Sequence, residues 1–336
     1  MSSNLKIVAD RNIPFLEGRL PEAELIRLPA TEIDSDSVRD ADALIIRTRT
    51  RCDSLLLKGS KVKLIATATI GTDHIDLSWC EANGITVRNA PGSNAPGVAL
   101  YVWSNMLRYG FDPSTDTLGV IGCGNVGSIV AQWAERLGAR VLASDPPRKD
   151  RGESDREYLP LEEVLAKSDA VTLHTPLTHA GAHPTFHLID KASIRHLKPG
   201  AIFVNAARGE VAETDALLKA IEEGRISRAI IDTWEGEPSI DPRLLELAAT
   251  ATTHIAGYSV EGKQRATRMA LEAVADTLHI PVDLSGLQGA YKDPAILTQE
   301  RIIEAYDPAG MTSALKADPA EFETLRNSYS LHREIL

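Results

Sequence analysis

The stretch "GVIGCGNVG" (Gly119–Gly127) places Gly122, Gly124 and Gly127 in the GxGxxG spacing, between a short apolar run and a helical pattern. In a dinucleotide-binding turn the first glycine permits a tight turn. The second lets a pyrophosphate approach the backbone, and the third lets the helix pack against the strand. The helix would meet the phosphates with its unpaired N–H groups and the positive end of its dipole. The spacing alone is a weak signal, so its interpretation depends on the surrounding sequence.

The next apolar run, "ARVLASD", ends in Asp145, close to the spacing of about 20 residues that the nucleotide motif requires. An acid at this position accepts hydrogen bonds from ribose hydroxyls and repels a 2′-phosphate. The pattern therefore predicts NAD as the cofactor rather than NADP. Arg148 leaves the alternative open, because a nearby arginine can accommodate that phosphate.

Apolar runs alternate with helical patterns through the middle of the chain, which predicts parallel strands joined by crossover helices in a doubly wound sheet. Near-continuous apolar character predicts that the strands are buried on both faces. The expected strands of this block are 117–122, 139–145, 169–175, 201–207 and 228–234, with 251–254 as a further one, and the clearest helices are 126–137 and 214–223. Three earlier runs, 5–10, 42–47 and 62–69, predict a second group of strands.

Two longer helical patterns, 93–110 and 259–280, bracket the regular block. They suggest that the chain leaves one domain, builds another and returns to the first. The expected division is a discontinuous domain of residues 1–94 and 258–280 around a nucleotide-binding domain of residues 95–257. The tail, 281–336, is polar, weakly periodic and too short for a confident independent core.

Composition excludes several classes of function. The chain has 336 residues and a net charge of -11, which argues against a nucleic-acid partner, since phosphate backbones need a basic face. No run approaches the roughly 20 apolar residues that a membrane span requires. The three scattered cysteines predict neither a disulfide framework nor a zinc site and favour a reducing cytoplasm.

Three polar side chains follow later strands, where open α/β sheets bind their ligands. They are Arg208, Glu237 and His254. An arginine can hold a carboxylate, a histidine can take a hydroxyl proton, and a carboxylate can orient that histidine. Together they suit oxidation of a 2-hydroxy acid.

Three histidines spaced four residues apart raise the alternative of a metal site. They are His179, His183 and His187, but Gly181 and Pro184 predict a loop there rather than the helix that would align them. No metal is expected. His74, in "GTDHID", is left open between a substrate contact and a turn cap.

The motifs "NAARGEV", "DTWEGEP" and "THIAGYSVEG" resemble the signature of the D-isomer-specific 2-hydroxyacid dehydrogenases. This resemblance implies that Arg208 and Glu237 are catalytic and that His254 is the acid/base. It also implies substrate contacts at Thr48, Thr69 and Tyr258. The residues implied for NAD binding, beside the three glycines, are Asn125, Val126, Asp145, Thr175, Asp232 and Gly257.

The resemblance extends over nearly the whole chain and implies a bilobal α/β enzyme. A Rossmann NAD domain would be joined by a discontinuous flavodoxin-like substrate domain and by a small C-terminal dimerisation domain, 281–336. The motifs "ATIGTDHID", "HTPLTHAG" and "EFETLRNSYSLHRE" resemble one branch of the family more closely, and this resemblance implies a small phosphorylated 2-hydroxy acid as substrate and a homodimer. The alternatives are a 3-phosphoglycerate dehydrogenase, a glyoxylate/hydroxypyruvate reductase and, more remotely, an NAD-sensing corepressor.

The basic stretch "ALIIRTRTR" (Ala43–Arg51) follows an expected strand of the substrate domain. Continued as a strand, it would put Arg47, Arg49 and Arg51 on one side and the intervening threonines on the other. The arginines could form an anion site or lie on a solvated face. The resemblance favours Thr48 as the direct contact, with Arg47 the arginine best placed to assist.

Overall fold

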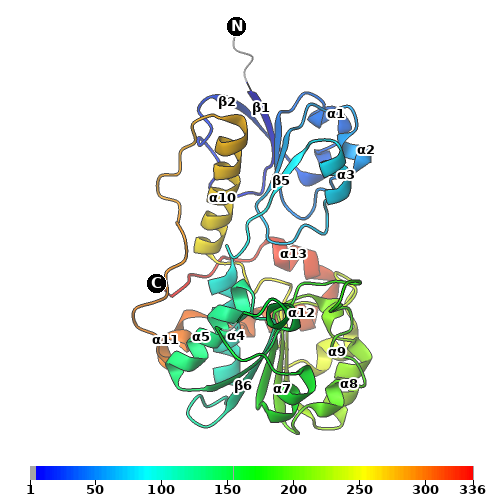
Figure 1. Ribbon diagram of the computed structural model, residues 1–336, viewed down its shortest axis with the longest axis vertical. Helices are drawn as coiled ribbons and strands as arrows, with labels where there is room; N and C mark the ends of the chain where they lie inside the picture. The colour runs from blue at the N-terminus through cyan, green and yellow to red at the C-terminus, as the bar shows by residue number, and fades with distance from the viewer. Residues whose placement is uncertain (1–4, 154, 336) are drawn as a thin grey trace. The chain divides into compact units, whose positions relative to one another are not determined.

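The computed structural model describes residues 5–153 and 155–335, which divide into two compact units. The first unit contains residues 5–94 and 259–292, and the second contains residues 95–258 and 293–335. In each unit helices lie against the faces of a central sheet (Figure 1). None of the helices in these residues combines the length and the apolar character needed to cross a membrane.

The first unit is built on a parallel sheet of five strands in the order β2–β1–β3–β4–β5. This order is typical of flavodoxin-like folds and confirms the predicted type of the smaller lobe. The strands are β1 Leu5–Asp10, β2 Ala23–Leu28, β3 Ala43–Ile46, β4 Leu64–Thr67 and β5 Thr86–Arg88.

Both faces of this sheet are covered, which explains why β3 reads as an unbroken apolar run. Ala43 and Ile45 pack toward the long helix α10 (Val260–Leu278), whereas Leu44 and Ile46 pack on the opposite side. That opposite side is covered by the short helices α1 Ser35–Val38, α2 Ser54–Leu57 and α3 Leu77–Ala82. The predicted helix over 259–280 is therefore confirmed. It covers one face of the first sheet although it lies far from that sheet's strands in the sequence.

The second unit contains a parallel sheet of six strands in the order β11–β10–β9–β8–β6–β7. An isolated bridge between Ala143 and Tyr158 adds one further position beyond β7. Counted with that position, the order is the Rossmann arrangement. The strands are β6 Thr117–Ile121, β7 Arg140–Ser144, β8 Ala170–Leu173, β9 Ala201–Asn205, β10 Ile226–Ile231 and β11 Thr250–Ala251.

Two apolar cores flank the second sheet, one on each face. One core contains helices α4 (Ala95–Arg108) and α5 (Asn125–Leu137), and the other contains α7 (Leu161–Lys167), α8 (Thr214–Glu222) and α9 (Pro242–Leu247). The predicted helices 126–137 and 214–223 are confirmed to within a residue. The short elements of the second unit are α6 Pro146–Asp150 and the 3-10 helices Ile194–His196 and Gly209–Val211. The first unit contains one further 3-10 helix, Ala30–Glu32.

The C-terminal tail carries helices that the weak periodicity of its sequence does not reveal. They are α11 Gln299–Ala305, α12 Ala309–Ala317 and α13 Phe322–Asn327, with a 3-10 turn at Pro319–Glu321. Ile302 and Tyr306 join the core around α4 and α5, whereas Leu315 and Phe322 join the core on the other face. Residues 293–335 thus group with the second unit of their own chain and residues 281–292 with the first. The role of the tail in dimerisation stays a prediction.

Candidate active site

The glycine loop lies between β6 and α5 and has the geometry that its spacing predicts. Gly122 has a φ of 86°, and a Cβ there would lie 2.9 Å from the backbone of Thr175. A Cβ on Gly127 would lie 1.9 Å from the Gly122 carbonyl oxygen, so only glycine lets α5 pack this closely. Apart from its own neighbours in the chain, no described atom lies within 4 Å of the equivalent position on Gly124, which leaves space for a ligand.

Asp145 lies directly beside this loop. Its carboxylate accepts the Cys123 N–H at 2.8 Å and the Arg148 N–H at 3.1 Å. The Arg148 guanidinium is held at 2.5 Å by Glu153 and at 3.4 Å by Asp155, and it also donates to the Cys123 carbonyl. With these partners Arg148 serves to tie the loop to the segment after α6. The geometry therefore weakens the alternative that Arg148 receives a 2′-phosphate.

Two buried polar atoms at the end of β8 have no hydrogen-bond partner among the described residues. They are the Thr175 hydroxyl and Nδ1 of His174. His174 Nε2 lies 3.0 Å from the Thr172 hydroxyl, and burial lowers the pKa of His174 to about 3. A neutral imidazole and an unsatisfied hydroxyl beside a nucleotide loop fit a bound dinucleotide, because a ligand can complete their hydrogen bonds.

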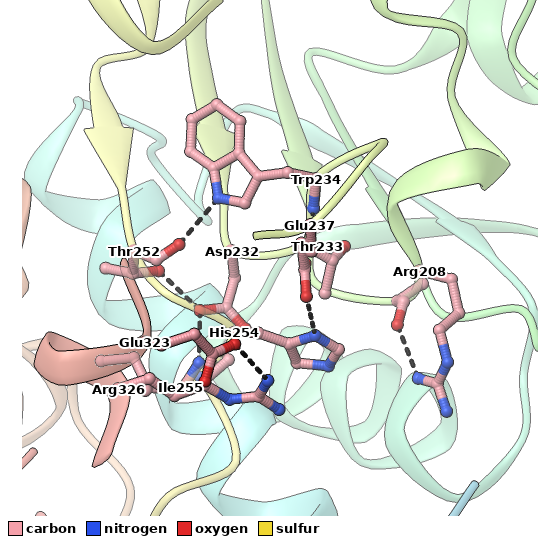
Figure 2. Close-up of polar contacts among 12 residues, drawn as sticks. Arg208, Asp232, Thr233, Trp234, Glu237, Thr252, His254, Ile255, Glu323 and Arg326 are labelled. Atoms are coloured by element: carbon pink, nitrogen blue, oxygen red, sulfur yellow. Dashed lines mark hydrogen bonds and ion pairs between the residues drawn. The ribbon is translucent and has the colours of Figure 1, made fainter. Parts of the chain in front are cut away.

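Glu237 and His254 form the predicted carboxylate–imidazole pair. His254 Nδ1 lies 3.0 Å from Glu237 Oε2, and Glu237 Oε1 accepts the Trp234 N–H at 2.8 Å (Figure 2). Burial raises the pKa of Glu237. The hydrogen bond and charge of His254, the Trp234 N–H and the charge of Arg326 outweigh that effect and hold the pKa below its usual value. Glu237 therefore remains a carboxylate and fixes the orientation of the imidazole.

The loop that carries His254 is held from below by Asp232, which is buried at the end of β10. One carboxylate oxygen accepts the Thr252 hydroxyl at 2.6 Å and the Ile255 N–H at 2.8 Å, and the other accepts the Ala256 N–H at 3.0 Å. These bonds hold His254 at a φ of 58°, a left-handed conformation uncommon outside glycine. The predicted strand 251–254 is therefore wrong in extent. β11 ends at Ala251, because the chain turns after it to bring its hydroxyl and N–H groups to the Asp232 carboxylate.

Arg208 follows β9 in a tight connection to the same group of loops. Asn205 Nδ2 donates to the Arg208 carbonyl at 3.0 Å, and a Cβ on Gly209 would lie 2.0 Å from the Trp234 carbonyl. The close approach links the Arg208 loop to the loop of Glu237. The guanidinium donates to the Ala207 carbonyl at 2.8 Å (Figure 2).

In the first unit, the predicted substrate residues Thr48 and Thr69 follow the adjacent strands β3 and β4. Thr48 is exposed, and Thr69 is half-buried. The Thr69 hydroxyl lies 2.6 Å from that of Thr67, which in turn lies 3.4 Å from His74 Nε2. His74 thus belongs to a hydroxyl chain at the carboxyl end of β4.

The strand interpretation of the basic stretch is wrong. β3 ends at Ile46, and the Thr50 N–H bonds the Arg47 carbonyl at 3.3 Å, which makes a turn. Arg47 instead pairs with the buried Asp10 at 2.9 Å, and Arg51 pairs with Asp53 at 2.8 Å. The alternation fails because the carboxylates that attract these arginines lie outside the stretch. An acid at the end of β1, next to β3 in a flavodoxin-like order, is the sequence signal that could have predicted the Arg47 pair.

Tyr258, the third predicted substrate residue, lies in the second unit beside the C-terminal segment. Its hydroxyl lies 3.3 Å from Nε of Arg326, and its ring packs edge-on to Tyr329 with centroids 6.3 Å apart. Gly257, a predicted NAD contact, precedes it in a turn closed by the Tyr258 N–H and the Ile255 carbonyl at 2.8 Å. Arg326 is absent from the sequence-based prediction, since nothing in the local pattern of the tail distinguishes it from other basic residues.

The three spaced histidines lie in a loop, as predicted, and each has its own neighbour. His183 pairs with Asp150 and His187 with Glu235, both at 2.6 Å, whereas the His179 ring lies tilted against Phe186 with centroids 4.8 Å apart. No group of side chains suited to hold a metal ion occurs in the described residues.

Comparison with known proteins defines the class. Residues 94–256 match the family described as D-isomer specific 2-hydroxyacid dehydrogenase, NAD binding domain. The structure of D-lactate dehydrogenase from Aquifex aeolicus, complexed with NAD and lactic acid, is similar with a TM-score of 0.68 and 27% identity, over 82% of this chain and 95% of that chain. NAD-bound 3-phosphoglycerate dehydrogenase from Entamoeba histolytica has a TM-score of 0.68 and 25% identity, over 86% and 99% of the two chains. This chain belongs to the D-isomer-specific 2-hydroxyacid dehydrogenases, and the part that matches their NAD-binding domain lies in the second unit.

Full-length relatives narrow the class further. The chain is 45% identical to erythronate-4-phosphate dehydrogenase of Bacteroides fragilis, over 98% of this chain and 97% of that protein. It is 38% identical to the erythronate-4-phosphate dehydrogenase of Porphyromonas gingivalis, over 98% and 94%. Within the family it groups with the erythronate-4-phosphate dehydrogenases. The prediction of an NAD-dependent dehydrogenase is confirmed over that of a corepressor.

Proposed function

We propose that the enzyme oxidises the C2 hydroxyl of 4-phospho-D-erythronate to (R)-3-hydroxy-2-oxo-4-phosphobutanoate with NAD, a step toward pyridoxal 5′-phosphate. The observation that carries the chemistry is the Glu237–His254 pair at 3.0 Å, on a loop that Asp232 anchors. The substrate is supported by relatives of 38–45% identity over almost the whole chain. The solved 3-phosphoglycerate dehydrogenase, which represents the main alternative, is 25% identical.

The geometry of the pair supports a role for His254 as the base that takes the proton. Glu237 occupies Nδ1 of His254, so Nε2 is the nitrogen that takes the C2 hydroxyl proton while the hydrogen on C2 leaves with its electron pair. The Glu237 carboxylate offsets the positive charge that the imidazole gains. Bound NAD supplies the acceptor for the hydride, and the glycine loop, Asp145 and Thr175 are the residues that would hold it.

Arg208 is proposed to hold the substrate carboxylate and to polarise the C2 oxygen, because a guanidinium offers two parallel donors to such a group. Thr48, Thr69 and Tyr258 are proposed as further substrate contacts. Hydroxyl groups at strand ends can donate hydrogen bonds to an anionic substrate.

The substrate is tested by the rate of NADH formation from 4-phospho-D-erythronate, with a hydrazine added to trap the 2-oxo product. The same assay with 3-phospho-D-glycerate, and the reverse assay with hydroxypyruvate, provide the comparison. We expect kcat/KM to be highest for 4-phospho-D-erythronate. A higher value for 3-phospho-D-glycerate would assign the enzyme to the alternative.

The proposed role of Thr48 predicts a selective effect of Thr48→Val. The KM for the phosphorylated acid should rise by about 5- to 10-fold, as expected for the loss of one hydrogen bond to an anion, while the Kd for NAD stays constant. Arg49→Gln, one residue further along the exposed turn, is the matched control. An unchanged KM in the Thr48 variant would return the role to Arg47 or Arg51.

We further propose a homodimer in the cytoplasm. The dimer is supported by the resemblance of residues 281–336 to a dimerisation domain, and the compartment by three buried thiols. Light scattering of the purified protein measures the mass directly, and a value of one chain at micromolar concentration would contradict the dimer.

A further inference from the structure

We infer that Arg326, in helix α13 of the C-terminal segment, is a substrate-binding residue and that it binds the phosphate group of the substrate. The inference rests on the proposed function, since it assigns the second anionic end of a phosphorylated 2-hydroxy acid. It concerns a residue that no sequence motif of the catalytic region contains.

Arg326 lies among the active-site residues of the second unit, although it is distant from them in sequence. Its side chain is 16% exposed, and its Nε lies 3.3 Å from the Tyr258 hydroxyl. The positive charge of Arg326 is one of the causes that lower the pKa of Glu237. Figure 2 shows Arg326 projecting from α13 toward the His254–Glu237 pair.

The surroundings hold the guanidinium in place without neutralising it in a tight ion pair. Glu323, one turn earlier on α13, approaches Nη1 only to 3.9 Å. The guanidinium carbon lies 6.0 Å from the centre of the Tyr258 ring, within the range of a cation–π contact. A largely buried cation with so long an ion pair can bind a stronger anionic partner.

The substrate offers such a partner at the right end of the molecule. Its carboxylate is bonded directly to the reacting C2 carbon, whereas its phosphate is separated from C2 by C3, C4 and an ester oxygen. A base between two cations suits a molecule of this shape, and in Figure 2 the His254 imidazole is drawn between the guanidinium groups of Arg208 and Arg326. With Arg208 assigned to the carboxylate, we assign the phosphate to Arg326, the other cation drawn beside the His254 imidazole.

Tyr258 supports this assignment, because it is a predicted substrate contact and lies directly against Arg326. Tyr329, also in the C-terminal segment, packs on the Tyr258 ring with centroids 6.3 Å apart. The tail therefore positions both the Tyr258 hydroxyl and the charged Arg326 side chain. A merely structural role for Arg326, as a brace for Tyr258, predicts equal effects on all substrates.

The test measures selectivity between substrates that differ only in the phosphate. In Arg326→Gln the KM for 4-phospho-D-erythronate should rise by about 10- to 100-fold, as expected for a lost hydrogen-bonded ion pair. The kcat/KM for unphosphorylated D-erythronate and the Kd for NAD should change less than about 2-fold. Arg326→Lys, which keeps the charge but loses the two-pronged geometry, should recover part of the affinity.

Arg301→Gln, a substitution in the same segment at α11, is the matched control and should leave both substrates unaffected. Equal losses for the phosphorylated and the unphosphorylated acid would overturn the inference in favour of a brace. If Arg326→Gln does not fold, the lysine variant decides by the same ratio. A wild-type enzyme inactive on 4-phospho-D-erythronate would contradict the proposed function instead, so the two failures are distinguishable.

Discussion

The two units contain the same kind of parallel sheet, but different residues occupy the switch point, the place where the strand order of the sheet reverses. In both, the first strand of the unit lies between its second and third strands, so the connections leave in opposite directions on its two sides. Such a position opens a crevice at the carboxyl ends of the strands. In the second unit a glycine loop follows the first strand, whereas in the first unit the buried Asp10 follows it and pairs with Arg47 at 2.9 Å. Topology therefore provides the location, and the loop residues decide its use.

Removing the base should have the largest effect on activity without altering the nucleotide crevice. His254→Gln should lower kcat by about 10³- to 10⁴-fold, because proton transfer by a positioned side chain contributes on that scale. The Kd for NAD should stay within about 2-fold, since the glycine loop and Asp145 belong to other elements. Stopped-flow kinetics and calorimetric titration with NAD measure the two quantities.

His187→Gln is the control for that variant, because His187 also pairs with a glutamate, Glu235, at 2.6 Å. It should keep nearly full activity. A loss of NAD affinity in His254→Gln comparable to the loss in kcat would contradict the assignment of His254 as the base.

Adding one methyl group at Gly127 should disrupt the glycine loop and abolish NAD binding by the second unit. In Gly127→Ala the new Cβ would lie 1.9 Å from the Gly122 carbonyl oxygen, so the start of α5 must move. We expect a loss of about 3 kcal/mol in unfolding free energy, as for other overpacked sites, and no measurable NAD binding. Denaturant unfolding and NAD titration test both parts.

Gly124→Ala is the matched comparison, because no described atom outside its own chain neighbours lies within 4 Å of the equivalent Cβ. It should leave stability unchanged and weaken NAD binding alone, since the methyl group would occupy the space of the pyrophosphate. Equal stability losses in the two alanine variants would show that the loop is only a structural turn.

Much of this distinction could be predicted from the sequence. The glycine spacing, the strands and the acid at Asp145 are local patterns, each confined to a few consecutive residues. The stretch Arg47–Arg51 was predicted wrongly because its conformation depends on Asp10 and Asp53, which its own alternation does not include. The helices of the tail and the position of Arg326 were missed for the same reason: their apolar residues complete cores formed by distant segments.

Breaking the ion pair of the first switch point should affect stability rather than cofactor binding. Arg47→Met leaves the fully buried Asp10 carboxylate without its cation, which should reduce the unfolding free energy by about 2 kcal/mol. The Asp10→Asn/Arg47→Met double variant should recover part of that loss, because no uncompensated charge remains. Denaturant unfolding of the four forms gives the coupling energy, and an additive cycle would show that the pair contributes nothing.

The smallest expected effect concerns an arginine that each unit restrains with carboxylates, Arg47 through Asp10 and Arg148 through Glu153. Glu153→Gln removes the closest carboxylate partner of the Arg148 guanidinium, now at 2.5 Å, and leaves Asp155 at 3.4 Å. The freed guanidinium can then approach a 2′-phosphate, so the ratio of kcat/KM for NADP to that for NAD should rise by about 2- to 5-fold, the scale of an exposed ion pair. Glu135→Gln, which breaks the Glu135–Arg156 pair at 2.7 Å, is the control and should leave the ratio constant. If Glu153→Gln also leaves it constant, Asp145 alone sets the preference for NAD, and Arg148 has only a structural role.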